Sequence, residues 1–378
     1  MSKENAVKEP LFHISKRASM PIWKKAIVYA AALLCGFIVC GIIFAVVFKL
    51  NPFSVYAGMF KGAFGTKRKF WRFVRDAMLL LGVGLALIPA FKMKFWNLGG
   101  NGQILVGALA SVACMFYLGG KMPDWSVNIL MFITSVIAGA IWAAIPATFK
   151  ALFKTNESLF TLMMNYVAVA LVQFAISKWN PNGSMSLAEI RVANLPTIGA
   201  NYMYLFISIS ILIIEIIMTI YLRFSKHGYE LAVVGESENT ARYIGINVKK
   251  VTIRTLCLSG AICGIVGFLL AGSWHHSITP ETANNMGFTS ILVAWLAGFN
   301  PIMMILSATF VTFLNNGMSG VLTTFNITSS AIPQVVIGIM YFCVLGFTFF
   351  ISYKVKLTKK IEIPFLKKKT KANDKEGK

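Results

Sequence analysis

Long apolar runs alternate with short polar or charged stretches along almost the whole chain. Runs such as 26–48, 203–222 and 332–353 have about 20 residues each, enough for an α-helix to cross the roughly 30 Å hydrocarbon core of a bilayer. Gly, Pro and charged residues divide the chain into about ten such segments. They are 26–48, 75–91, 103–119, 126–148, 158–178, 203–222, 254–272, 287–299, 301–316 and 332–353. The pattern predicts an all-α polytopic membrane protein.

Composition supports this interpretation. Of the 378 residues, 57% are hydrophobic and 13% are charged, and the mean hydropathy is +0.69. A soluble domain carries about 25% charged residues, so a water-soluble fold of this composition would expose large apolar patches. The net charge of +22 would suit nucleic acid, but most Lys and Arg lie at the ends of apolar runs, as in the cytoplasmic loops of membrane proteins. We therefore expect a lipid bilayer, and no nucleic acid, as a partner.

The distribution of Lys and Arg predicts the orientation. The N-terminal lead (1–25) and the lysine-rich tail (354–378) are both basic, so both ends are expected in the cytoplasm and the number of spans should be even. Residues 26–353 form the expected transmembrane domain. The largest internal loop, 223–251, is also basic and falls on the cytoplasmic side. The basic stretch 61–75 disagrees with this scheme, because the number of spans before it puts it outside.

No motif for catalysis or for a bound metal occurs. The six cysteines lie inside apolar runs without the CxxC spacing of metal sites, and the pair His275-His276 stands alone. The chain has no GxxxxGK[ST] loop to hold the phosphates of ATP. We expect no catalytic residue, no metal site and no cofactor in this chain.

A polar interruption between two apolar runs marks a candidate substrate path. The segment FWNLGGNGQILVGALA covers 95–110. Its small and polar members include Asn97, Gly99, Asn101 and Gln103. Glycines permit unusual backbone angles, and amide side chains can satisfy freed backbone groups or meet a solute in a water-lined cavity. Residues 97–110 have a partial echo in 285–297, which predicts inverted repeats whose broken helices meet near the transport site. The alternative is a pair of unrelated glycine clusters that pack helices.

Two further polar positions lie inside apolar spans. Asn165 shares one helix face with Gln173 and is a second candidate for the path, or for interhelical hydrogen bonding. Glu215 is the one clear acid within a span, and an acid at membrane depth usually faces protein or water. A stand-alone secondary transporter coupled to an ion gradient would use such an acid. This function stays open as the alternative.

The loop 223–251 contains the signals of a short helix. Ser237 is a good N-cap, Glu238 complements the helix dipole, and Gly245 is a natural stop. The expected helix, 239–244, is too short to be stable alone in water. Its aromatic and charged side chains are suited to a groove on another protein.

The same loop resembles the coupling helix of permease subunits in bacterial ABC importers, in the branch that carries branched-chain amino acids, simple sugars and nucleosides. The residues that match the family pattern are Gly228, Tyr229, Gly235, Glu236, Ala241, Arg242, Tyr243 and Gly245. The phrases NLGGNGQ (97–103), NESLFTLMMNYVA (156–168) and GFTSILVAWLAG (287–298) resemble other phrases of the family. The last one adds Phe288 and Thr289 to the candidate substrate path. Asn101 and Thr289 stand where the family has an acid.

The resemblance implies the membrane-spanning subunit of an ATP-driven importer in a bacterial plasma membrane, closest to the nucleoside or simple-sugar permeases. It also implies three kinds of partner. These are ATP-binding cassette subunits that use ATP and Mg²⁺, a second permease subunit of the same or a different sequence, and an extracellular solute-binding protein. The chain itself would then be a transport subunit and not an enzyme.

Overall fold

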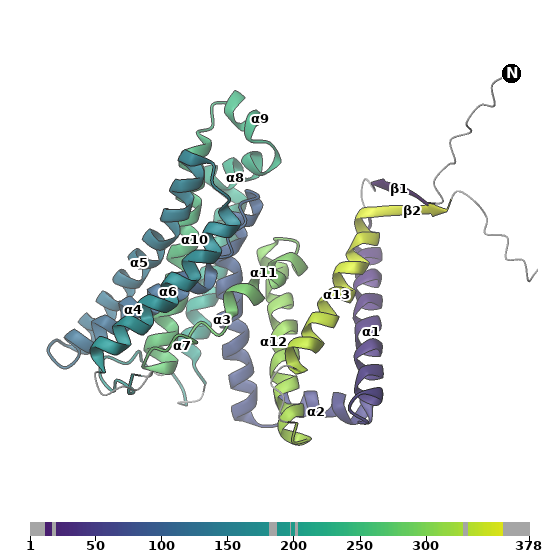
Figure 1. Ribbon diagram of the computed structural model, residues 1–378, viewed down its shortest axis with the longest axis horizontal. Helices are drawn as coiled ribbons and strands as arrows, with labels where there is room; N and C mark the ends of the chain where they lie inside the picture. Colours follow the sequence, from purple (N-terminus) through teal and green to yellow (C-terminus); the bar gives the residue numbers. More distant parts are fainter. Residues whose placement is uncertain are drawn as a thin grey trace, which may run out of the picture. The chain divides into compact units, whose positions relative to one another are not determined.

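The computed structural model of the protein describes residues 12–16, 20–180, 187–196, 198–200, 203–327 and 332–357. Most of them are helical (Figure 1), which confirms the predicted all-α class. Parts of the expected lead and most of the expected tail lie outside these residues, so their cytoplasmic location stays a prediction. The chain forms two compact units, Leu50–Ile337 and the described parts of Met1–Lys49 and Gly338–Lys378.

The smaller unit is a helix pair with a short ribbon. It contains β1 (Phe12–Lys16), α1 (Ile22–Val46), β2 (Tyr353–Leu357) and, from Gly338 on, α13 (Ile332–Ser352). The two strands are antiparallel, with Phe12 opposite Leu357. A Cβ atom on Gly36 would lie 2.6 Å from the Met340 sulfur. The absence of a side chain at Gly36 therefore lets α1 and α13 pack closely.

The larger unit holds the remaining helices. They are α2 (Pro52–Phe64), α3 (Lys67–Lys92), α4 (Gly100–Leu118), α5 (Asp124–Phe153), α6 (Glu157–Trp179), α7 (Leu205–Phe224), α8 (Lys226–Glu236), α9 (Glu238–Tyr243), α10 (Val248–Leu270), the π-helical turn η1 (Ala271–His275), α11 (Met286–Leu296) and α12 (Pro301–Thr324). The apolar stretch of α3 is 83% buried and that of α10 with η1 is 78% buried, against 28% for each of α5, α6 and α7. The helices α3 and α10 therefore form the core, and α5 to α7 present apolar surface suited to lipid.

Glycines set the close packing around α10. A Cβ atom on Gly264 would lie 2.2 Å from the Ser135 carbonyl oxygen of α5, and one on Gly107 of α4 would lie 2.6 Å from the Gly264 Cα atom. Such distances leave no room for a side chain. Small residues allow membrane helices to approach this closely, and the gain is van der Waals contact along the crossing.

Two expected spans differ from the structure. The span expected at 75–91 is α3, which begins at Lys67, so most of the basic stretch 61–75 belongs to the first turns of a helix and not to a loop. The span expected at 287–299 is α11, whose 11 residues extend only about 16 Å and cannot cross a bilayer. The segment 276–285 connects η1 to α11. Nine helices of the described residues are long and apolar enough to span a membrane.

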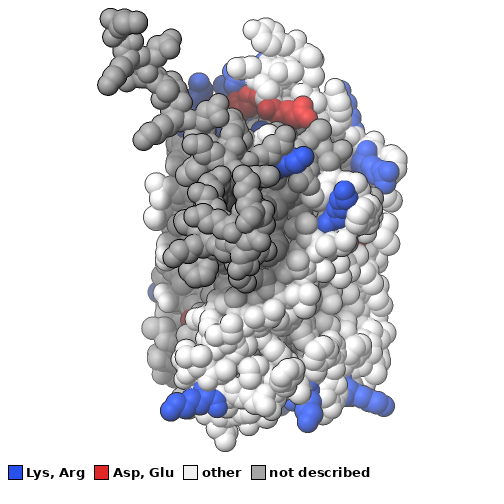
Figure 2. Space-filling view, turned by 90° about the vertical axis from the view of Figure 1, so that its right-hand side faces the viewer, with Lys and Arg blue, Asp and Glu red and all other residues white. Residues whose placement is uncertain are grey.

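Most described charged residues on the face seen in Figure 2 lie near its two ends, with largely uncharged surface between them. This distribution is typical of a protein with an apolar belt in the bilayer. In the larger unit, one end carries α9, and the other carries the first turns of α3 together with η1 (Figure 1). We call these the α9 end and the far end.

Candidate functional site

The two echoed segments meet inside the larger unit. The helix α4 begins at Gly100 and α11 begins at Met286, and a Cβ atom on Gly100 would lie 3.2 Å from the Gly287 Cα atom. A Cβ atom on Gly287 would lie only 2.4 Å from the Asn101 nitrogen. The two helix N-termini therefore touch backbone to backbone. We call this contact, with the amide side chains around it, the helix junction.

The two helices leave the junction in opposite directions. At the C-terminal end of α11, Trp295 stacks on Trp96 with ring centroids 5.6 Å apart, and Phe299 stacks on Phe91 near the end of α3. The helix α11 therefore runs toward the α9 end. The helix α4 runs parallel to α10, because Asn97 bonds Ser259 while Gly107 contacts Gly264 farther along both helices. It therefore leads away from the α9 end. Opposite running of the two echoed helices is the relation expected of inverted repeats.

Amide side chains satisfy the free backbone groups at the junction. The Gly287 N–H donates to Asn101 Oδ1 at 2.7 Å, and the Gly102 N–H donates to Asn165 Oδ1 at 2.8 Å. The Asn165 Nδ2 group donates in turn to the Leu98 carbonyl at 2.9 Å. The first N–H groups of a helix have no partner within the helix, and in lipid each would be costly if it were left bare. These asparagines therefore stabilise helix ends inside the membrane region, where unpaired backbone groups would otherwise be costly.

The remaining predicted path residues fall into a buried and an open group. Asn97 and Gln103 are 0% and 1% exposed, and the Gln103 Nε2 group donates to Asn97 Oδ1 at 3.2 Å. Gly99 is buried and its N–H donates to the same oxygen. By contrast, Phe288 is exposed and Thr289 is half-buried on α11. The open side of the junction is thus on α11, and the polar residues of 97–103 support it from within.

The short helix predicted in the loop 223–251 is present. It is α9, with Ser237 as N-cap, and the Ser237 Oγ atom accepts from the Thr240 N–H at 3.2 Å. Gly245 follows with a φ of +84°, a left-handed conformation that glycine adopts without steric penalty. The sequence did not reveal that the preceding residues form a second helix, α8, whose N-cap Ser225 accepts from the Gly228 N–H.

Glycines hold this helix pair close to the membrane helices. A Cβ atom on Gly228 would lie 2.6 Å from the Leu222 carbonyl oxygen, and one on Gly235 would lie 2.0 Å from the Lys92 carbonyl oxygen. The turn from α7 into α8 and the contact of α8 with the end of α3 therefore both need glycine. Of the family-matched residues, Ala241 is the one on α9 that packs inward, at 0% exposure.

The other family-matched side chains of the pair point outward. Tyr243 is 91% exposed and Tyr229 is 63% exposed, and Glu236 is exposed as well. The Arg242 guanidinium lies 3.5 Å from the Glu238 carboxylate, with both side chains more than half exposed. A cavity of about 960 Å³ adjoins α9. Its lining includes Lys94, Lys150, Glu157, Glu236, Arg242 and Lys249. An exposed tyrosine beside a cavity lined by charged residues is typical of a surface that binds another protein.

One buried residue of this region has no signal in the sequence. His227, at the start of α8, is 2% exposed and is hydrogen-bonded to the Tyr221 hydroxyl and, at 3.3 Å, to Thr255 Oγ1. Burial, reinforced by the nearby Arg254 guanidinium, lowers the pKa of His227 below its ordinary value. The neutral imidazole therefore joins α7, α8 and α10 at the base of the pair formed by α8 and α9.

Comparisons with known proteins agree with this arrangement. Residues 70–345 match the model of a family described as branched-chain amino acid transport system, permease component. The guanosine ABC transporter permease protein NupP of Bacillus subtilis is 28% identical over 324 residues, which cover 82% of this chain and 92% of that protein. The nucleoside permease NupB of Lactococcus lactis is 26% identical, with 88% and 92% covered. The glucose permease TsgB13 of Haloferax volcanii is 24% identical, with 90% and 93% covered.

Proposed function

The chain belongs to the family of permease components of branched-chain amino acid transport systems, and from this premise we propose that it carries a nucleoside or a simple sugar into the cell. It is the membrane-spanning subunit of an ABC importer, a multi-pass protein of the plasma membrane and a transport component, not an enzyme. The solute class rests on relatives whose names specify guanosine, nucleosides and glucose. The assignment of residues to roles below is part of the same proposal.

The coupling helix pair, α8 and α9, receives an ATP-binding cassette subunit that uses ATP and Mg²⁺. The contact residues are those of the family pattern that face outward, with Tyr243 and Arg242 at the centre. The observation that carries this role is the contact of Gly235 with the Lys92 carbonyl oxygen. It places the exposed helix pair directly against the end of the core helix α3, so a rigid-body movement of α8 presses on α3.

The helix junction forms part of the solute path. Phe288 and Thr289 provide its open side, while Asn97, Gly99, Asn101, Gln103 and Asn165 keep the broken helices in place. A solute-binding protein delivers the solute at the far end, and a second permease subunit, identical or different, completes the enclosure. Glu215 is 5% exposed and accepts from the Thr219 hydroxyl, which gives this acid a local partner on its own helix. Because this partner is not an ionisable group, the contact adds no support to the alternative of an ion-coupled carrier.

Charge reversal on α9 tests the coupling role. We expect Arg242→Glu or Tyr243→Ala, in the complete transporter, to leave ATP hydrolysis active but to reduce solute uptake at least about tenfold, because loss of a central interface contact costs about 1–2 kcal/mol or more. The measurements are ATP hydrolysis and uptake of radiolabelled solute in the same proteoliposomes.

The double variant Glu238→Arg with Arg242→Glu is the matched control. It retains an ion pair four residues apart on α9 but reverses the charges that a partner meets. If helix stability alone mattered, the double variant would recover uptake. Recovery, or normal uptake in both single variants, would contradict the coupling role.

A further inference from the structure

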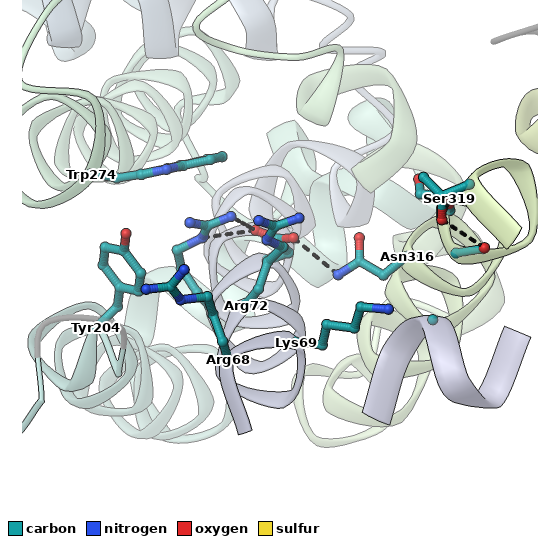
Figure 3. Close-up of a pocket in the computed structure, with 12 residues that line it drawn as sticks. Arg68, Lys69, Arg72, Tyr204, Trp274, Asn316 and Ser319 are labelled. Atoms are coloured by element: carbon teal, nitrogen blue, oxygen red, sulfur yellow. Dashed lines mark hydrogen bonds and ion pairs between the residues drawn. The ribbon is translucent and has the colours of Figure 1, made fainter. Parts of the chain in front are cut away.

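The far end of the larger unit contains a cavity of about 680 Å³ that the coupling mechanism does not use. Figure 3 shows side chains of α3 in its centre, with Trp274 and Tyr204 on one side and Asn316 and Ser319 on the other. Its charged lining residues are Arg68, Lys69, Arg72, Arg75 and Asp76. This volume lies within the range of small-molecule sites, about 300–1,000 Å³.

One of the four cations is part of the framework. Arg75 is 5% exposed and donates to Asp76 Oδ1 through two nitrogens, at 2.7 and 2.9 Å. Its guanidinium carbon lies 3.5 Å from the centre of the Trp274 ring, a cation–π contact with a residue of the π-helical turn η1. The other Asp76 oxygen accepts from Asn316 Nδ2 at 3.0 Å. The single acid of the cavity is thus fully engaged and its charge is balanced by Arg75.

The other three cations are uncompensated. Arg68, Lys69 and Arg72 are exposed on successive turns of α3 and make no ion pair with any residue that the structure describes. They repel one another, and they lie at the end opposite the coupling helix pair, where the orientation bias of membrane proteins disfavours Lys and Arg. An anion bound between them would reduce this repulsion and would give the three cations an ion-pair partner.

The helix junction also favours negative charge. At the helix junction, the N-termini of α4 and α11 meet, and each carries about half a positive charge from its helix dipole. The side chains that bond these ends are neutral amides, Asn101 and Asn165. The electrostatic potential is therefore positive both in the cavity and at the junction, although different helices form them.

We propose that the transported solute carries a phosphate group, as a phosphate ester of a nucleoside or sugar does, and that Arg68, Lys69 and Arg72 bind this group at the far end. This inference rests on the proposed function for the inward movement of the solute, but the binding step is independent of it. Arginine forks match phosphate oxygens with paired hydrogen bonds. Arg75 and Asp76 hold the cavity in shape and do not themselves bind the phosphate.

Binding to the full chain in lipid nanodiscs tests the proposal. The probes are a purine nucleoside and its 5′-monophosphate, a hexose and its 6-phosphate, and inorganic phosphate. We expect at least one phosphate ester to bind about tenfold or more tightly than its neutral parent at low salt, and this difference to shrink as the ionic strength rises toward 1 M, where the Debye length is about 3 Å. Arg72→Gln and Arg68→Gln should each abolish most of the difference. Lys121→Gln is the matched control, because Lys121 is an exposed cation after α4 at the same end but outside the cavity.

Two results would overturn the proposal. One is equal affinity for ester and neutral parent in the unaltered chain. The other is that Arg68→Gln and Arg72→Gln weaken only the association with the purified binding protein, in which case the cations dock acidic side chains of that protein. Either result would leave ATP-driven uptake of neutral nucleosides, and hence the proposed importer function, intact. Failure of the importer function would instead appear as a lack of any response to Arg242→Glu.

Discussion

The closest backbone contact of the helix junction can be tested with one methyl group. In Gly287→Ala, the new Cβ atom would lie 2.4 Å from the Asn101 nitrogen, 2.7 Å from Asn101 Oδ1 and 2.9 Å from the Gly100 carbonyl carbon. Two of these atoms are backbone and cannot rotate away. To restore an ordinary contact of 3.4 Å, α11 would have to retreat from α4 by roughly 1 Å.

That retreat also breaks a hydrogen bond. The Gly287 N–H donates to Asn101 Oδ1 at 2.7 Å, and a shift of roughly 1 Å places the acceptor beyond hydrogen-bond range. A buried N–H without a partner costs about 1–3 kcal/mol, and overpacking costs about 1–3 kcal/mol. The better helix propensity of alanine returns about 0.5–1 kcal/mol. The net expectation is a destabilisation of about 3 kcal/mol, or a fall of roughly 5–10 °C in Tm.

The assay is thermal unfolding of the purified protein in detergent, followed by near-UV circular dichroism and size-exclusion chromatography. Gly338→Ala serves as the control, because Gly338 is also helical but a Cβ atom there meets nothing within 4 Å. It should keep or raise the Tm, since only helix propensity changes. A Gly287→Ala protein that melts with the wild type and imports solute at the wild-type rate would refute the close junction.

Two further predictions concern other polar contacts. Asn101→Ala should lower stability by about 1–3 kcal/mol, because the Gly287 N–H loses its acceptor, whereas Asn101→Asp should keep the wild-type Tm at pH 7, because a carboxylate accepts the same bond beside two helix N-termini. Because the pKa of His227 is lowered in the folded state, the unfolded chain binds the proton more readily, so the contribution of His227 to stability is complete above about pH 6.5 and is lost as the pH falls below that value. Thermal unfolding at pH 7.5 and pH 5.5 should therefore show a smaller acid loss in His227→Gln than in the wild type, and equal losses would contradict a buried neutral imidazole.

Local rules predicted those features that depend on neighbouring residues. Hydropathy located nearly all the spans, because the length of each apolar run can be read from the sequence and compared with the thickness of the bilayer. The short helix α9 followed from Ser237, Glu238 and Gly245, since caps and stops act within one turn. The echo between 97–110 and 285–297 predicted a meeting of two segments, and the structure brings them together at Gly100 and Gly287.

Long-range contacts limited the rest of the prediction. Asn101 and Asn165 cap backbone groups in elements distant along the chain, and no local pattern shows which N–H an amide will meet. The basic stretch 61–75 read as a loop because charged residues usually flank spans, but most of its cations lie on exposed turns of α3 beside a cavity. The amphipathic α8 was missed because its buried side rests on α3 and α7, contacts that exist only after folding.

The core helix α3 links the two regions to which a function is assigned. Its last residue, Lys92, contacts Gly235 of α8. Its first turns carry the cations of the far cavity, and Arg68, Lys69 and Arg72 lie about 30–36 Å from Lys92 along the same helix. The segment that follows Lys92 leads within a few residues to Asn97, which bonds Ser259 of α10. A packed helix transmits displacement with little compression. We therefore expect a push on α8 to move the cavity cations relative to Asn316 and Ser319 on α12, and to strain the helix junction in the same movement. Release of an anion at the far end and opening of the path would then be two consequences of one displacement of α3.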